Sequence, residues 1–186
     1  MAGTYTPVAL TVSVTGEKED LLTLLADQRA LLRITARGLT DEQARQKTTV
    51  SDLNIGGLIK HLASGFRATA QTIVDRGENA EFDMAAVADA YALRDDETID
   101  GWLDEYDRAA EAFDQVIADV ASLDDLIPQP TAPWQPEREW WTVRKMTLHL
   151  LRETAHHSGH ADIIREALDG QSTMAAISEG QSWADS

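Results

Sequence analysis

The sequence contains no cysteine among its 186 residues. Disulfide bonds, thiolate metal ligands and a cysteine nucleophile are therefore excluded within the chain. Any thiol chemistry would need a sulfur that arrives with a small co-substrate. Basic residues are also scarce: 16 lysines and arginines stand against 32 aspartates and glutamates, a formal charge of −16. Because nucleic acids and anionic membranes are bound through clustered basic residues, we expect neither as a partner.

Long apolar runs are missing as well. No run approaches the roughly 18 residues of a membrane-spanning helix, and MAGTYTPVALTVSV at the N-terminus lacks the basic and apolar regions of a secretion signal. A cytoplasmic protein is therefore expected. Phosphate-binding glycine loops are absent too, and Ser158 lacks the strand–turn–helix context of a nucleophile elbow.

The chain does contain four long helical patterns, in which apolar residues recur at helical spacing over 17–38, 55–76, 98–120 and 142–168. Residues suited to helix starts and helix ends flank them. The expected starts are Thr15, Asn54 and Thr98, and the expected ends are Gly38, Gly77 and Gly170. Thr40 and Gln43 have the spacing of a capping box. The third pattern carries six acidic residues that we expect on a solvated face: Asp104, Glu105, Asp107, Glu111, Asp114 and Asp119.

This pattern predicts one all-α domain over 1–186, a four-helix bundle with its core at about 17–170. The arm 1–16 and the tail 171–186 are expected to be loosely ordered. Residues 77–96 predict an irregular segment with one helical piece around 84–93.

Four of the five prolines lie in one connection, LDDLIPQPTAPWQPEREWW at 123–141. Such proline density excludes a helix and predicts a stiff, partly extended crossing loop. The connection also holds Trp134, Trp140 and Trp141. These tryptophans could form the lip of a pocket, or they could fasten the connection to the bundle.

The fourth pattern carries a stripe of mixed chemistry. At 100° per residue, one face collects an apolar residue at each end with a carboxylate and three imidazoles between them: Met146, His149, Glu153, His157, His160 and Ile164. Apolar ends indicate a face turned to the core, where an unpartnered polar group costs about 1–3 kcal/mol. A metal ion would satisfy this cluster, and a buried hydrogen-bond network is the alternative. His156 lies off the stripe.

Glu153 and His157 are four residues apart, so both can reach one ion. His61, on the 55–76 pattern, could supply a third ligand and leave a coordination position open, as in catalytic zinc sites. His149 or His160 could replace or supplement a ligand. Zinc is the expected metal, and a carboxylate with two imidazoles also suits nickel, iron or manganese.

Two segments resemble the DinB-like superfamily of metal-binding four-helix bundles: GGLIKHLA at 56–63 and RETAHHSGHADIIREALDG at 152–170. The likeness is to its actinobacterial branch and extends from LLADQRALLRITARGLTDEQA to Gly170. It implies a bundle with a long crossover between the second and third helices. It also implies metal ligands from one histidine on the second helix and two residues four apart on the last.

Carried onto this chain, those ligands are His61, Glu153 and His157. Many members of the superfamily have histidine where this chain has Glu153, and a glutamate there resembles the mycothiol-dependent maleylpyruvate isomerases. Relatives with known activity are thiol-dependent S-transferases and isomerases of the detoxification type. The resemblance therefore implies mycothiol as co-substrate, its sulfur attacking a small electrophile.

Five further residues are candidates for contacting the bound molecules. Arg67, Arg144 and Arg152 could anchor anionic groups, with surface ion pairs as the alternative, and Trp134 and Trp141 could line the site. Two other functions stay open: a non-catalytic metal- or ligand-binding bundle, and a metal-dependent hydrolase in which bound water attacks. A homodimer is expected from the resemblance.

Overall fold

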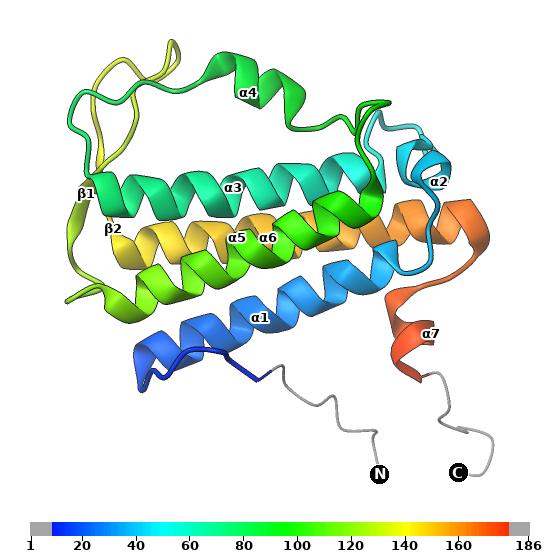
Figure 1. Cartoon of the computed structure of the whole chain (residues 1–186), viewed down its shortest axis with the longest axis horizontal. Coiled ribbons are helices and arrows are strands. Elements are labelled where there is room, and N and C mark those ends of the chain that lie inside the picture. The colour runs from blue at the N-terminus through cyan, green and yellow to red at the C-terminus, as the bar shows by residue number, and fades with distance from the viewer. Residues whose placement is uncertain (1–8, 179–186) are drawn as a thin grey trace.

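The computed structural model describes residues 9–178, apart from the side chains of residues 86–88 (Figure 1). Four long helices pack together: α1 (Glu17–Ala36), α3 (Ile55–Asp75), α5 (Ile99–Asp119) and α6 (Val143–Asp169). Between and after them lie α2 (Asp41–Arg45), α4 (Met84–Asp89), α7 (Thr173–Ser178) and two short strands, β1 (Leu126–Pro128) and β2 (Trp140–Thr142). The predicted all-α bundle is confirmed.

The order of the helices explains how distant segments meet. α1 and α6 run in one direction and α3 and α5 in the other, so the chain must return along the whole bundle between α3 and α5 (Figure 1). The connection that contains α4 makes this return, which confirms the predicted crossover. α3 packs mainly on α5 and α1 on α6, and α3 also contacts α6. The second and last long helices, which carry the predicted ligands, are therefore neighbours.

Most of the predicted helix boundaries are confirmed. The Asn54 side chain accepts a hydrogen bond from the backbone N–H of Gly57 at 2.8 Å, Thr98 caps α5, and Thr40 forms the predicted capping box at α2. Gly170 ends α6 with φ at 80°. Each of these signals involves only neighbouring residues, so sequence spacing suffices to find it.

Two boundary predictions were wrong. α1 has no side-chain cap from Thr15, because Gly16 occupies the cap position with φ at 64°. α3 ends through Arg76, which takes the left-handed conformation at φ 48°, instead of through Gly77. A non-glycine residue in this region is uncommon, and the Arg76 side chain forms an ion pair with Asp125 at 2.9 Å.

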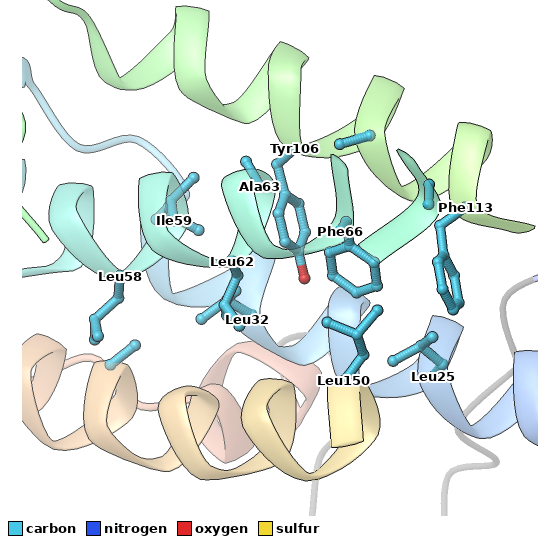
Figure 2. Packing of buried hydrophobic residues seen from close by; sticks show 14 of the residues in the cluster. Leu25, Leu32, Leu58, Ile59, Leu62, Ala63, Phe66, Tyr106, Phe113 and Leu150 are labelled. Carbon is cyan, nitrogen blue, oxygen red and sulfur yellow. The ribbon is translucent and has the colours of Figure 1, made fainter. Parts of the chain in front are cut away.

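One continuous apolar cluster fills the space between the four long helices. Phe66 lies at its centre, with its ring edge-on to Tyr106 and Phe113 at centroid distances of 5.8 and 5.7 Å. Figure 2 shows these rings packed together with Leu25 and Leu150, so every long helix contributes. Such edge-on pairs add about 0.5–1.5 kcal/mol each beyond the buried area.

A buried ion pair crosses this core. Asp114 of α5 was predicted on a solvated face, and the structure corrects this: it is 3% exposed and accepts two hydrogen bonds from Arg29 of α1, at 2.8 and 2.6 Å. The partner lies 85 residues away in the sequence, beyond the reach of a periodicity argument.

The proline-rich connection contains no helix and is extended in part, as predicted. Its two ends pair as antiparallel strands, with Leu126 opposite Thr142 and Pro128 opposite Trp140. This pairing brings the chain directly into the first turn of α6, which the Thr142 side chain caps. Among the helices of residues 9–178, none is long and apolar enough to cross a lipid bilayer.

Candidate metal centre

His61, Glu153 and His157 converge where α3 packs on α6. One potential ligand atom from each lies within 4.8 Å of the other two. His157 Nε2 and Glu153 Oε2, one helical turn apart, are separated by 3.6 Å. Two ligands held about 2.1 Å from a tetrahedral ion lie about 3.4 Å apart, so this spacing fits a shared ion. The three residues could hold a metal ion.

The protonation states of these groups also suit a metal. Burial, together with the neighbouring His61 and against the opposing charge of Glu153, lowers the pKa of His157 to about 4. Burial likewise lowers the pKa of His61. Burial would raise the pKa of Glu153, but Arg152 and the nearby imidazoles outweigh it and keep the pKa low. At neutral pH the cluster offers two neutral imidazoles and a carboxylate, the forms that metals bind.

The remaining residues of the stripe surround this triad. Arg152 Nη2 donates to Glu153 Oε1 at 2.7 Å and lies 2.9 Å from His149 Nδ1. Glu153 therefore turns one oxygen to Arg152 and the other toward His157. His160 Nδ1 lies 3.5 Å from His157 Nδ1 on the side away from Glu153. His149 contacts Arg152, which pairs with Glu153, and His160 lies against His157, so both imidazoles border the triad.

Tyr91 is a neighbour of the triad that sequence reasoning missed. Its hydroxyl lies 3.1 Å from His61 Nε2, and its ring stacks on the imidazole with centroids 4.1 Å apart. Burial raises the pKa of the phenol, and the charge of Glu153 raises it further, so the hydroxyl stays protonated. The residue comes from the irregular crossover, where no periodicity marks it. The available signal was the Gly56–Gly57 pair, which indicates close approach of another backbone.

The tryptophans predicted to line the site lie in two different places. Trp141 packs edge-on against His149 at 5.5 Å and carries Lys145 Nζ over its ring at 3.8 Å, so it borders the stripe. Trp134 is 62% exposed and packs edge-on against Phe82 at 5.7 Å. Among the contacts of residues 9–178, none links Trp134 to the triad.

The three arginines predicted to contact bound molecules also lie in different places. Arg152 belongs to the triad's surroundings, as described. Arg67 pairs with Glu105 of α5 at 2.8 Å, and Arg144 pairs with Glu17 and Asp124. These three ion pairs lie on the surface, which was the alternative expected for each arginine.

Two hollows of the described surface, of about 210 and 450 Å³, lie against α1 and α5. Neither is lined by a residue of the triad or by a tryptophan. The pocket expected beneath the tryptophan-rich connection therefore stays a prediction.

The model of the mycothiol-S-transferase family matches residues 20–170. The chain belongs to this family. A solved structure of a conserved protein from Enterococcus faecalis is similar, with a TM-score of 0.63 and 12% sequence identity over 85% of this chain and 100% of that one. At that identity the likeness shows the fold, and it confirms the DinB-like bundle. A comparison with curated proteins found no match.

Proposed function

We propose that this protein is a metal-dependent mycothiol S-transferase whose metal is held by His61, Glu153 and His157. The observation that carries the proposal is the convergence of two neutral imidazoles and one carboxylate, from two helices, in a member of this family. A thiol co-substrate also agrees with the absence of cysteine, since the chain itself has no sulfur nucleophile. Homodimer formation remains part of the proposal.

The chain's own residues would prepare the site in three ways. Glu153 supplies the negative charge, and Arg152 holds one of its oxygens so that the other faces His157. The neutral imidazoles present lone pairs without a proton to displace. Arg152, with a side chain 69% exposed, stands at the edge where a substrate would enter.

A divalent ion held there would supply Lewis acidity that lowers the pKa of the co-substrate thiol, making a thiolate near neutral pH. In transfer to an alkyl halide, the sulfur–carbon bond forms as the carbon–halogen bond breaks. The halide leaves with the bonding electrons, and the thiol proton passes to solvent. An isomerase would use the same thiolate in a reversible addition that returns the thiol.

The experiment is metal analysis of the purified protein together with a transfer assay. We expect about one zinc per chain, lost in His61→Ala and His157→Ala, and mycothiol conjugation to a bromobimane fluorophore that depends on the metal. Mycothiol should also raise the melting temperature only when metal is present, by preferential binding to the folded state.

Each alternative has its own signature in this experiment. Metal binding without thiol-dependent turnover would indicate a non-catalytic bundle. Consumption of an ester substrate without any thiol would indicate a hydrolase. A protein that holds no metal under replete conditions would contradict the proposal and leave the polar stripe as a hydrogen-bond network.

A further inference from the structure

A tyrosine from the crossover lies directly on the triad. The Tyr91 hydroxyl approaches His61 Nε2 to 3.1 Å, and the two rings stack nearly parallel, at 18°. The phenol ring is also tilted toward His157, with centroids 6.1 Å apart. A third segment of the chain, besides α3 and α6, therefore contributes a polar group to the site.

The backbone of Tyr91 is seated on a glycine of α3. A Cβ atom at Gly57 would lie 2.1 Å from the carbonyl oxygen of Tyr91, a distance that no side chain allows. A Cβ atom at Gly56 would likewise meet Leu93 at 2.8 Å. Gly57 and His61 are four residues apart and share one face of α3. Seating the Tyr91 backbone over Gly57 consequently places the phenol over the imidazole one turn further on.

A buried lysine anchors the same segment from its other side. Lys60, 3% exposed, donates from Nζ to the Asp89 carboxylate at 2.8 Å, the Ala92 carbonyl at 3.1 Å and the Glu97 carboxylate at 2.9 Å. The guanidinium of Arg45 donates to three further carbonyls of this segment, those of Leu93, Arg94 and Glu97. Residues 89–97 are thus fixed on both sides of Tyr91, so the position of the phenol is built into the fold.

We propose that Tyr91 is a positioning residue of the metal centre, which holds the His61 imidazole in one orientation and one tautomer. The inference rests on the proposed metal-binding function. A neutral imidazole carries one N–H, and the proposed tautomer is the one in which Nε2–H donates to the Tyr91 oxygen, which leaves the Nδ1 lone pair for a metal. Stacking then limits rotation of the ring. Partners of this kind typically change metal affinity by about 10–100-fold.

The first test compares zinc affinity in matched variants. Tyr91→Phe keeps the stacked ring and removes the hydroxyl, and we expect about tenfold weaker binding in competition with a chromophoric chelator. Tyr91→Ala also removes the stacking and should bind more weakly still. Tyr106→Phe is the control: it makes the same chemical change at a buried hydroxyl that has no hydrogen-bond partner in the described part of the chain. Its zinc affinity should equal that of the wild type.

Two readouts separate positioning from a general effect on folding. In the metal-free protein, ¹⁵N chemical shifts of the His61 ring should report one tautomer in the wild type and a mixture in Tyr91→Phe. With cobalt in place of zinc, the visible absorption should change in Tyr91→Phe and stay unchanged in Tyr106→Phe. Gly57→Ala, which keeps the phenol but displaces its backbone, should behave like Tyr91→Phe, while metal-free Tyr91→Phe should melt as the wild type does.

The outcomes distinguish this inference from the proposed function. A wild type that binds zinc, with Tyr91→Phe equal in affinity, cobalt spectrum and His61 tautomer, would overturn the role of Tyr91 and leave the metal site standing. Tighter binding by Tyr91→Phe would overturn it too, because the phenol would then compete with the metal for His61. A wild type without metal would refute the proposed function, and this inference with it.

Discussion

Two of the polar clusters that lie among the long helices differ in how their charges are arranged. Arg29 and Asp114 form a closed pair of opposite charges, with side chains 11% and 5% exposed and two hydrogen bonds between them. The triad of His61, Glu153 and His157 instead gathers one carboxylate and two neutral imidazoles, three groups that each present a lone pair. In the first cluster the two charges neutralise each other, whereas the second has no cation among its three members and could take one.

This difference shows which buried polar residues serve the fold and which point to a function. Both clusters place polar side chains on helix faces that are otherwise apolar, so composition and spacing make them look alike. The charges of their members distinguish them. Opposite charges at hydrogen-bond distance form a structural contact, whereas converging lone pairs are typical of a metal-binding site. Changing one member of each cluster and measuring stability and metal affinity tests this distinction.

The largest effect on stability should come from the closed pair. Asp114→Ala leaves the Arg29 guanidinium buried without its partner, and we expect a loss of about 3–5 kcal/mol in the free energy of unfolding. Urea unfolding measures this loss. Asp104→Ala, at an exposed position of the same helix, is the control and should change stability by less than about 0.5 kcal/mol.

The metal content of Asp114→Ala, per folded chain, should equal that of the wild type. A destabilisation below about 1 kcal/mol would mean that the pair is worth no more than an exposed ion pair.

A change in the triad of His61, Glu153 and His157, the open cluster, should lower metal affinity and leave the stability of the metal-free protein unchanged. Glu153→Gln keeps the size of the side chain and removes its charge, so metal affinity should fall at least about 100-fold while the metal-free protein unfolds as the wild type does. Glu153→His supplies another competent ligand and should retain the metal. Chelator competition and urea unfolding of the same samples test both statements. If metal-free Glu153→Gln were strongly destabilised, the triad would be a structural network after all.

A third cluster consists of Lys60 with the carboxylates of Asp89 and Glu97. Like the pair of Arg29 and Asp114, it should contribute to stability and not to metal binding. Burial would raise the pKa of Glu97, but the backbone N–H of Arg94 and the Lys60 ammonium outweigh it and hold the pKa below its usual value. A depressed pKa stabilises the fold above the usual carboxyl pKa, and this contribution is lost as the pH falls through the folded-state pKa. Glu97→Gln should therefore cost about 2 kcal/mol at pH 7, and the difference should shrink toward pH 3.5.

Metal-free protein must be used for this comparison, so that the triad does not contribute. Asp96→Asn, an exposed carboxylate in the same segment, is the matched control and should show a small difference at both pH values. A gap between wild type and Glu97→Gln that stays constant with pH would show that Glu97 acts through packing and not through its charge.

The features predicted from the sequence are those that local spacing determines. The helix ends at Asn54, Thr98 and Gly170 depend only on neighbouring residues, and the stripe on α6 follows from the helical period. The structure brings together the three residues proposed as ligands, and their binding of metal stays a prediction. Thr15 failed as a cap because Gly16 takes a positive φ that changes the direction of the chain.

What the sequence could not provide depends on contacts between distant segments. Asp114 reads as one more acidic residue of a solvated face until α1 brings Arg29 against it. Tyr91 lies in a connection without periodicity, and its position follows from Gly57 and Lys60, about thirty residues earlier in the chain. Trp134 was grouped with Trp141 because both lie in one connection, yet only Trp141 packs beside the stripe.

The smallest expected effect distinguishes the three arginines. Arg152 contacts Glu153 and His149 at the open cluster, whereas Arg67 and Arg144 are engaged in ion pairs on the surface. Arg152→Gln should raise the KM for an electrophile that bears a carboxylate by about tenfold, the value of one charge-assisted hydrogen bond. The KM for a neutral analogue of that electrophile should rise less, because that analogue loses no contact with the Arg152 guanidinium and is affected only through Glu153. Arg67→Gln and Arg144→Gln should leave both KM values and the melting temperature within error of the wild type, because exposed pairs contribute little. If either of these raised KM as much as Arg152→Gln does, the substrate would extend beyond the edge of the triad, and the open cluster would be larger than the described contacts indicate.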